Sequence, residues 1–232
     1  MRAFVLAGGL GTRLRPAFGD LPKVLVPVGG TPWIDRQLAW LAQNAIRRVI
    51  LCVGHGADQV ERHVGDGSRY GIALAWSREE TPLGTGGALA HARGFVDGPA
   101  LVLNGDTLPD CDPWALERAR WEHGAVAALA LFQADDARAT GRVECDTEGR
   151  VARFVEKDER HRGPAWVSGG AYAVAPALWR RLPAERPCSL ERDVFPALAS
   201  EGVLRGVLCR ASFVDIGTPE SWEAADRRFA EA

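Results

Sequence analysis

The stretch "RAFVLAGGLGTRLRPAFGDLPKVLVPVGG", Arg2–Gly30, contains the pattern on which the fold prediction rests. Residues 2–7 form a short apolar run that ends at glycines, which predicts a buried strand followed by a tight loop. The same loop region carries Arg13 and Lys23. Glycines together with positive charge directly behind a buried strand indicate that this first loop holds an anion.

Apolar runs and helical patterns alternate through the first half of the chain. The predicted strands are 2–7, 47–54, 72–77 and 100–106. Helices are predicted from Thr31, which supplies the cap residue before Pro32 in the first turn, over 57–64 and near 86–93. Because the apolar runs show no period of two, they indicate parallel strands that are covered on both faces. We predict an α/β fold, a Rossmann-like doubly wound mixed sheet.

The second half of the chain is more mixed in pattern. Strands are predicted at 125–132, 141–146, 150–157, 168–175, 204–210 and 212–217, and helices at 176–182, at 189–200 and from Pro219. The turn at 146–149 predicts a hairpin. We expect a single domain, 1–232, in which residues 111–232 complete the sheet begun by residues 1–110 and build one wall of a pocket. Ligands of such sheets bind at the carboxyl ends of the strands.

Composition excludes several functions. Of the 232 residues, 47% are hydrophobic, so an ordinary core is expected. The net charge of −2, from 28 Lys+Arg and 30 Asp+Glu, argues against a nucleic-acid partner bound through bulk charge. The five cysteines include no CxxC pair, so neither a zinc ribbon nor a disulfide framework is indicated. With no apolar run of membrane-spanning length, we expect a cytoplasmic protein without a membrane partner.

The glycine loop suits phosphate but matches neither of two common phosphate-binding motifs. Gly8, Gly9 and Gly11 lack side chains, so the backbone N–H groups there can approach a phosphate closely. The Walker A pattern is absent, because no Gly-Lys-Ser/Thr follows. The dinucleotide fingerprint fails too, because Leu14 stands where its third glycine belongs.

"LAGGLGTRLRP" and the following "PKVLVPVGGTP" together resemble the signature of the nucleoside-diphosphate-sugar pyrophosphorylases, the sugar-1-phosphate nucleotidyltransferases. The resemblance implies that residues 1–110 bind a nucleoside triphosphate and residues 111–232 a sugar phosphate. It implies that Arg13 grips the β- and γ-phosphates, and that Lys23 contacts the α-phosphate and the sugar phosphate. The nucleotide contacts implied in this loop are Leu6, Gly8, Gly9, Gly11 and Thr12.

Further matches to this family follow in order along the chain. The segment "LGTGGAL", 83–89, matches the part that contacts base and ribose, and "LNGD", 103–106, matches the part that bears the first metal-binding aspartate. The segments "RFVEK", "VSGGAY" and "FVDIGTP" match sugar-phosphate contacts and the second metal aspartate. The residues so implied are Gly84, Thr85 and Gly86 for the nucleotide, Asn104, Glu156, Lys157, Gly169 and Gly170 for the sugar phosphate, and Asp106 and Asp215 for the metal.

The implied reaction needs these residue types. A sugar 1-phosphate attacks the α-phosphate of the triphosphate and expels pyrophosphate, so two anions have to meet. Fixed cations at Arg13 and Lys23, with Mg²⁺ held by Asp106 and Asp215, offset that repulsion. Hard oxygen ligands with few protein carboxylates suit Mg²⁺. No general base is required, because the attacking phosphate is already ionised.

The choice of substrates is less constrained. The segments "ETPLGTGGAL", "LNGDT" and "DIGTPESW" look most like the guanylyltransferases that use GTP and D-glycero-α-D-manno-heptose 1-phosphate. Uridylyl- or thymidylyltransferases of N-acetylmuramate 1-phosphate or glucose 1-phosphate are the alternative. A retaining glycosyltransferase would need an Asp-x-Asp motif where Asn104-Gly105-Asp106 stands. A catalytically silent nucleotide-binding subunit would be expected to lack a phosphate-binding cation or a metal aspartate. A monomer and a homo-oligomer both remain open.

Overall fold

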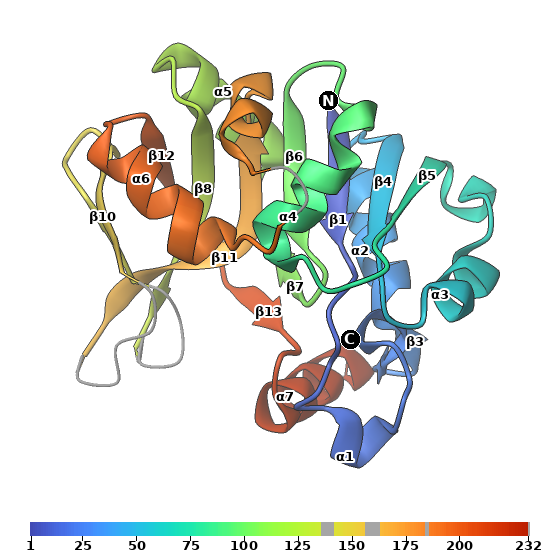
Figure 1. Cartoon of the computed structure of the whole chain (residues 1–232). Coiled ribbons are helices and arrows are strands. Elements are labelled where there is room, and N and C mark those ends of the chain that lie inside the picture. Colours follow the sequence, from blue (N-terminus) through green and yellow to red (C-terminus); the bar gives the residue numbers. More distant parts are fainter. Residues whose placement is uncertain (136–141, 156–162, 184–185, 232) are drawn as a thin grey trace.

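Within the described part of the chain, nine strands form one mixed sheet (Figure 1). The computed structural model describes residues 1–135, 142–155, 163–183 and 186–231. Four neighbouring strands are parallel, in the spatial order β6 (Ala100–Asn104), β1 (Arg2–Leu6), β4 (Arg48–Val53) and β5 (Ala73–Arg78). The strands predicted from the apolar runs of the first half are therefore confirmed.

Antiparallel pairing begins on the far side of β6. The long strand β11 (Ala165–Val174) runs antiparallel to β6, β8 (Ala127–Ala134) pairs with β11, and β12 (Leu204–Leu208) runs parallel to β8. The predicted hairpin consists of β9 (Arg142–Cys145) and β10 (Val151–Val155). Its turn is closed by Asp146, whose Oδ1 accepts the N–H groups of Glu148 and Arg150. The mixed sheet is confirmed.

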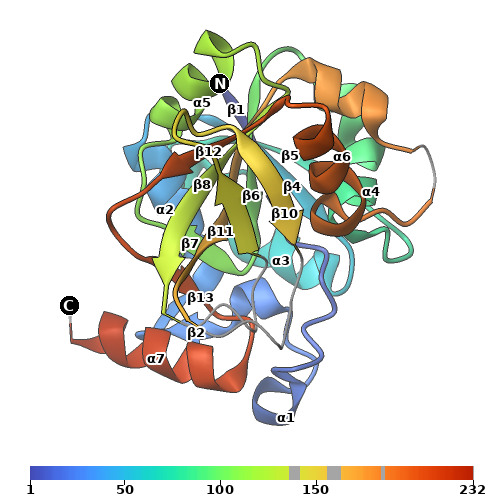
Figure 2. The same ribbon diagram turned by 90° about the vertical axis from the view of Figure 1, so that its left-hand side faces the viewer.

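Helices cover both faces of the sheet (Figure 2). α2 (Trp33–Gln43), α3 (Ala57–Val64) and α5 (Pro113–Glu122) pack on one face, and α4 (Gly84–His91) and α6 (Phe195–Ser200) pack on the other. Both faces of the sheet are apolar because side chains alternate along each strand. In β1, Phe4 packs in the core beneath α4 and α6, whereas Ala3 and Val5 pack in the core beneath α2, α3 and α5. Short 3₁₀ turns lie at Lys23–Leu25, Ser68–Tyr70, Ala92–Phe95 and Pro176–Arg181, and a π-helical turn at Leu190–Val194. Among the described residues, every helix is too short or too polar to span a bilayer.

A small lobe lies beyond the carboxyl ends of the parallel strands, at the bottom of Figure 1. It contains α1 (Arg15–Phe18), α7 (Pro219–Ala230) and two ribbons, β2 (Pro27–Val28) with β3 (Thr31–Pro32) and β7 (Thr107–Pro109) with β13 (Phe213–Asp215). Its own core packs around the fully buried Trp33. The strand predicted at 212–217 exists as β13, but it pairs with β7 and leaves the main sheet.

The start of α2 differs from the prediction. Thr31 does not cap the helix: it pairs with Val28 in the β2–β3 ribbon, and α2 begins only at Trp33 without a side-chain cap. The ribbon turns at Gly29 and Gly30, whose φ angles are +55° and +72°. Because glycine adopts positive φ readily, the "VGGTP" segment forms a hairpin before the helix can begin.

Candidate active site

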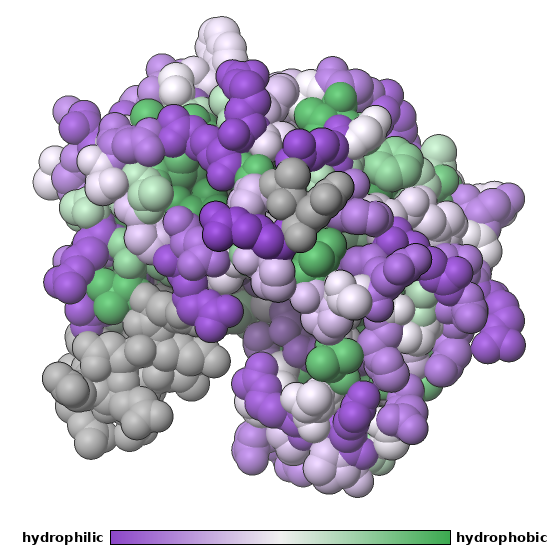
Figure 3. Space-filling view, in the orientation of Figure 1, coloured by the Kyte–Doolittle hydropathy of each residue, from purple (hydrophilic) through white to green (hydrophobic). Residues whose placement is uncertain are grey.

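A cavity of about 340 Å³ opens at the carboxyl ends of β1 and β6. In the space-filling view the surface is hollowed above the lobe that contains α1 and α7 (Figure 3). The cavity therefore lies where the sequence predicts a site. Of the predicted site residues, those that line it are Leu6, Gly8, Gly9, Gly11, Thr12, Arg13, Lys23, Gly84, Thr85, Asn104 and Asp106.

The glycine loop after β1 forms one wall of this cavity. A Cβ atom at Gly9 would meet no atom within 4 Å, so the backbone there borders open space. A Cβ atom at Gly8 would lie 2.6 Å from Oε1 of Glu79, which follows β5. Absence of a side chain at Gly8 thus lets this loop lie directly against the end of β5, and absence of one at Gly9 leaves room for a ligand.

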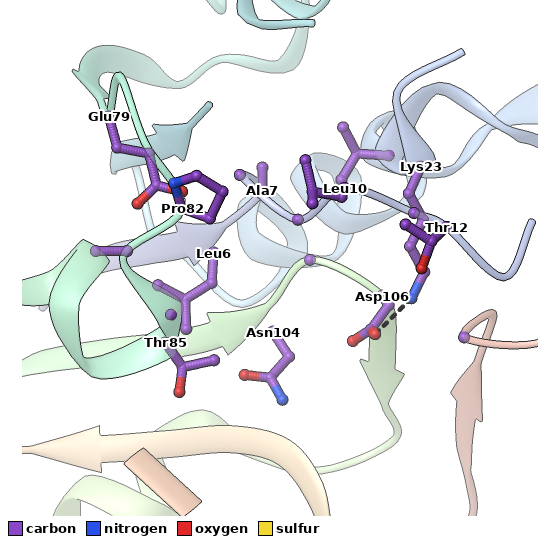
Figure 4. A pocket seen from close by; sticks show the side chains of 18 of the residues that line it. Leu6, Ala7, Leu10, Thr12, Lys23, Glu79, Pro82, Thr85, Asn104 and Asp106 are labelled. Carbon is purple, nitrogen blue, oxygen red and sulfur yellow. Dashed lines mark hydrogen bonds and ion pairs between the residues drawn. The ribbon is translucent and has the colours of Figure 1, made fainter. Parts of the chain in front are cut away.

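Cations and aspartates gather at one end of the cavity, where Figure 4 shows Lys23 beside Asp106. Lys23 Nζ donates to Asp106 Oδ2 at 2.6 Å, and both side chains are largely buried, with 13% and 29% exposed. Arg13 Nη2 lies 3.3 Å from where a Cβ of Gly217 would stand, two residues beyond Asp215. Asp215 does not itself line the cavity, but Gly217 does. The fold thus brings together four charged side chains from three distant segments.

Asp215 is held in an environment that disfavours its charge. Burial and the neighbouring Asp106 carboxylate raise the pKa of Asp215, while the Gly217 N–H and Lys23 oppose that rise. Asp215 Oδ1 accepts from the Gly217 N–H at 2.5 Å and from the Ser221 hydroxyl at 3.2 Å. Two carboxylates that repel each other in a buried place are stabilised by a cation between them.

The donor set at this end suits a divalent cation with oxygen ligands. Asp106 and Asp215 supply carboxylates, and no cluster of three or more His, Cys, Asp or Glu side chains capable of holding a metal exists among the described residues. Two protein carboxylates leave most of an octahedral shell to phosphate oxygens and water, which is how Mg²⁺ is usually held. The residues present therefore fit Mg²⁺ better than a structural zinc ion.

The opposite end of the cavity is formed by Glu79, Pro82, Gly84 and Thr85. Burial raises the pKa of Glu79, and a hydrogen bond from the Leu83 N–H opposes that rise. Glu79 Oε2 is buried and has no hydrogen-bond partner within the described part of the chain. Glu79 thus lines this end of the cavity with a carboxyl group whose hydrogen-bonding capacity is not fully used.

The glycine-rich start of α4 serves packing as well as the cavity. Thr85 Oγ1 donates to Glu191 Oε2 and accepts from the Leu190 N–H, both at 2.8 Å. The N–H groups of Gly86 and Gly87 donate to the carbonyl oxygen of Cys188. The predicted nucleotide contact Gly86 is buried against Cys188 and is not among the cavity-lining residues. Its N–H group is bonded to Cys188 and is therefore not free to bind a ligand.

The residues predicted to contact the sugar phosphate divide into three groups. Asn104 lines the cavity, and its Nδ2 donates to the Tyr172 hydroxyl at 3.2 Å. Gly169 and Gly170 are buried in β11, where side chains would collide with Phe132 and Thr107; they lie outside the cavity wall. The predicted contacts at Glu156 and Lys157 lie outside the described residues.

Three polar residues next to the predicted site escaped the sequence analysis. Glu79 directly follows β5 and could have been found by the rule that located Asp106, since it too stands at the carboxyl end of a parallel strand. Glu191 lies in the segment predicted to be an ordinary helix. Gln37 stands three residues after Ile34 and four before Leu41, so helical spacing could have marked it as a polar residue on the buried face of α2.

Comparison with known proteins matches residues 2–231 to the family described as Nucleotidyl transferase. This chain belongs to the nucleotidyl transferase family. Among its relatives, the mannose-1-phosphate guanylyltransferase of Mycobacterium tuberculosis is 37% identical over 223 residues, which is 95% of this chain and 62% of that protein. The mannose-1-phosphate guanylyltransferase catalytic subunit beta of Xenopus tropicalis is 34% identical over 227 residues, 96% of this chain and 62% of the relative.

Solved structures agree with this membership of the nucleotidyl transferase family. HddC from Yersinia pseudotuberculosis superposes with a TM-score of 0.86 at 29% identity, over 98% of this chain and 99% of HddC. HddC complexed with GMP-PN superposes with a TM-score of 0.85. This chain thus matches HddC over nearly the whole of both proteins, whereas it spans about three fifths of the length of the mannose-1-phosphate enzymes.

Proposed function

We propose that this nucleotidyl transferase is a sugar-1-phosphate guanylyltransferase. An oxygen of the sugar 1-phosphate attacks the α-phosphorus of GTP in line, the bond to the pyrophosphate leaving group breaks, and GDP-sugar and pyrophosphate result. The observation that carries the proposal is the grouping of Arg13, Lys23, Asp106 and Asp215 at one end of a cavity walled by the glycine loop. All four charged groups that the reaction needs are present, which argues against a silent subunit.

Each residue of this group has a distinct proposed task. The backbone of residues 8–12 holds the triphosphate, Arg13 pairs with the outer phosphates, and Lys23 lies where it can contact the attacked α-phosphate. Asp106 and Asp215 would hold Mg²⁺, which when bound offsets the charge of the phosphates that meet there. The Lys23–Asp106 ion pair orients both side chains for these tasks. No residue has to remove a proton, because the attacking phosphate is ionised.

Glu79 supports guanine as the base. With phosphates at the Lys23 end, the base lies toward Glu79, Pro82 and Thr85. Guanine presents adjacent N1–H and N2–H₂ donors, and a carboxylate accepts two such donors at once. Uracil and thymine present one N–H between two carbonyl oxygens. A carboxylate at Glu79 would repel these carbonyl oxygens. The relatives named above are guanylyltransferases, which supports the same choice.

For the sugar, we propose D-glycero-α-D-manno-heptose 1-phosphate, with mannose 1-phosphate as the second candidate. The heptose proposal rests on the resemblance of the segments "ETPLGTGGAL", "LNGDT" and "DIGTPESW". The mannose alternative rests on the relative that is 37% identical. Asn104, Gly169, Gly170, Glu156 and Lys157 remain the predicted contacts of the sugar phosphate.

The test is release of pyrophosphate with Mg²⁺, using GTP, UTP, ATP, CTP and dTTP against heptose, mannose, glucose and N-acetylmuramate 1-phosphates. We expect GTP with the heptose to give the highest kcat/KM. A preference for UTP or dTTP would overturn the guanine assignment and retain the reaction. Absence of release by the folded protein with every pair would overturn the reaction itself.

A variant of Glu79 tests how the base is chosen. In Glu79→Gln an amide replaces the carboxylate, so one acceptor oxygen becomes a donor that matches the C2 carbonyl of xanthine. We expect kcat/KM for GTP to fall about 10²-fold and that for XTP to rise above it. Glu80→Gln, at the neighbouring exposed carboxylate, is the matched control. Equal use of GTP by the wild type and Glu79→Gln would contradict the assignment.

A further inference from the structure

Gln37 is a fully buried polar side chain in the middle of α2, with 0% of its surface exposed. Its Nε2 donates two hydrogen bonds, one to the carbonyl oxygen of Asn104 and one to that of Thr107, both at 2.8 Å. Its Oε1 has no partner among the described residues. Burying an amide is unfavourable unless its hydrogen bonds are made, so the two bonds to this turn are what keep Gln37 inside.

The turn that Gln37 bridges carries Asp106. Residues 104–107 connect β6 to β7, and the two carbonyl groups that Gln37 binds flank Gly105 and Asp106. The Gly105 N–H donates to Leu6 at the end of β1, and the Asp106 carbonyl accepts from the Ile216 N–H beside β13. The backbone of Asp106 is therefore tied to α2, to the glycine-loop strand and to the β13 segment.

The same turn also bears on Asp215. Thr107 pairs with Asp215 in the β7–β13 ribbon, so the residue whose carbonyl Gln37 holds stands opposite the second aspartate. A rotation of this turn would move Asp106 directly and Asp215 through the ribbon. One buried amide thus holds the turn that carries Asp106, and that turn leads into the strand paired with the one that carries Asp215.

We propose that Gln37 is a positioning residue that sets the geometry of Asp106 and Asp215 for the divalent cation, an inference that rests on the proposed function. Without the amide donors, two carbonyl groups are left without their partners in the core, and the turn rotates to recover hydrogen bonds. The carboxylates then leave the spacing that suits one small cation. Groups that orient metal ligands typically change metal affinity 10- to 100-fold when removed.

The test measures how strongly Mn²⁺ tightens binding of a fluorescent GTP analogue in which an imido group replaces the α,β-bridge oxygen, the position at which the proposed reaction breaks its bond. The ratio of the dissociation constants without and with Mn²⁺ reports the coupling between nucleotide and metal and does not require turnover. The variants are Gln37→Met, which keeps the size and removes the donors, and Gln37→Asn, which reaches one carbonyl at most. Leu41→Ala is the control, because Leu41 is buried in the same helix and core without a bond to the turn.

We expect Gln37→Met to lower the coupling ratio about tenfold with little change in metal-free affinity, and Gln37→Asn to lower it less. Leu41→Ala should lower the melting temperature and keep the wild-type ratio. A wild-type ratio in folded Gln37→Met, or in Gln37→Asn if the methionine variant does not fold, would overturn the positioning role alone. Absence of coupling in the wild type would overturn both this role and the proposed metal site.

Discussion

Lys23 and Asp106 face each other at the reacting end of the cavity, yet their proposed tasks are separate. In the proposed reaction Lys23 would offset phosphate charge and Asp106 would hold the cation, so neither could replace the other. We expect Lys23→Ala and Asp106→Asn each to lower kcat about 10²-fold or more, because each removes charge stabilisation that acts on the transition state. Steady-state kinetics with circular dichroism as a fold check measures this.

Asp110→Asn provides the matched control for these two variants. Asp110 is an exposed carboxylate just beyond β7, on the same ribbon as Asp106 but outside the cavity. Its variant should keep kcat within about twofold, since exposed changes away from a site rarely exceed a few tenths of a kcal/mol. A near-normal kcat in Asp106→Asn or Lys23→Ala would remove that residue from the proposed mechanism.

Glu79 predicts a pH dependence whose sign follows from its raised pKa. Between the ordinary glutamate pKa and the raised one, the folded protein holds a proton that the unfolded chain has lost, so stability falls as the pH rises through this window. Glu79→Gln removes the effect. The melting temperature of the variant relative to the wild type should therefore increase from about pH 4 to pH 7.

The same carboxyl should also shape substrate binding. Below its raised pKa, Glu79 is protonated and loses an acceptor for the guanine N–H groups, so KM for GTP should rise on acidification. In Glu79→Gln this part of the pH profile should be absent. Identical KM profiles of the two proteins would show that Glu79 does not bind the base in its charged form.

At the scale of elements, α7 supports the far end of the glycine-loop segment. The Gly29 N–H donates to Asp226, the Trp222 indole donates to the Pro27 carbonyl, and Arg36 lies over the Phe229 ring at 4.1 Å. The two hydrogen bonds join α7 to the β2–β3 ribbon, and the contact of Arg36 with Phe229 joins it to α2. Lys23, which stands just before that ribbon, is thus placed partly by α7.

Substitutions at two neighbouring glycines, Gly29 and Gly30, can test the contact between the β2–β3 ribbon and α7. Both Gly29 and Gly30 have positive φ, but a Cβ at Gly29 would lie 2.7 Å from Phe229, whereas one at Gly30 would meet nothing within 4 Å. Gly29→Ala should lower the free energy of unfolding by about 1–3 kcal/mol more than Gly30→Ala, because only the first adds a collision to the backbone strain. Urea denaturation measures the difference. Equal losses of unfolding free energy in the two variants would show that α7 moves to accommodate the added methyl group without destabilising the protein.

Elements defined by local patterns were predictable from sequence, and those defined by distant partners were not. The β9–β10 turn uses Asp146 as turn chemistry expects. The helix α3 follows its apolar spacing, and α7 starts at the predicted Pro219. The local sequence predicted a helix cap at Thr31, but Thr31 pairs with Val28 in the β2–β3 ribbon instead. The close packing of Gly86 on Cys188 joins residues about a hundred positions apart, which no short-range pattern encodes.

Across the whole molecule, the candidate site draws on residues from position 6 to position 217. The strand-end rule was enough to bring Asp106 to the glycine loop, because both follow parallel strands. It could not place Gln37, whose role depends on which turn α2 covers. A resemblance to known enzymes supplied Asp215, since β13 lies outside the main sheet to which that rule applies.

A site that joins so much of the chain should stabilise all of it when filled. At a GTP concentration 100 times Kd, with Mg²⁺, binding adds about 2.7 kcal/mol to the free energy of unfolding. For a chain of this size that raises the melting temperature by roughly 5–10 °C. Differential scanning fluorimetry should show this shift with GTP and a smaller one with UTP or CTP. Equal shifts with all three nucleotides would contradict the guanine preference.

The clamp between α7 and the β2–β3 ribbon has a consequence for biosynthesis. Its hydrogen bonds join residues 195 and 197 positions apart, so the ribbon gains these contacts only after α7 has been synthesised. At usual translation speeds of about 5–20 residues per second, that wait is roughly 10–40 s. During it the nascent chain carries an incomplete nucleotide pocket with Trp33 uncovered. The ribbon that follows Lys23 is therefore completed only after every strand of the main sheet has been synthesised.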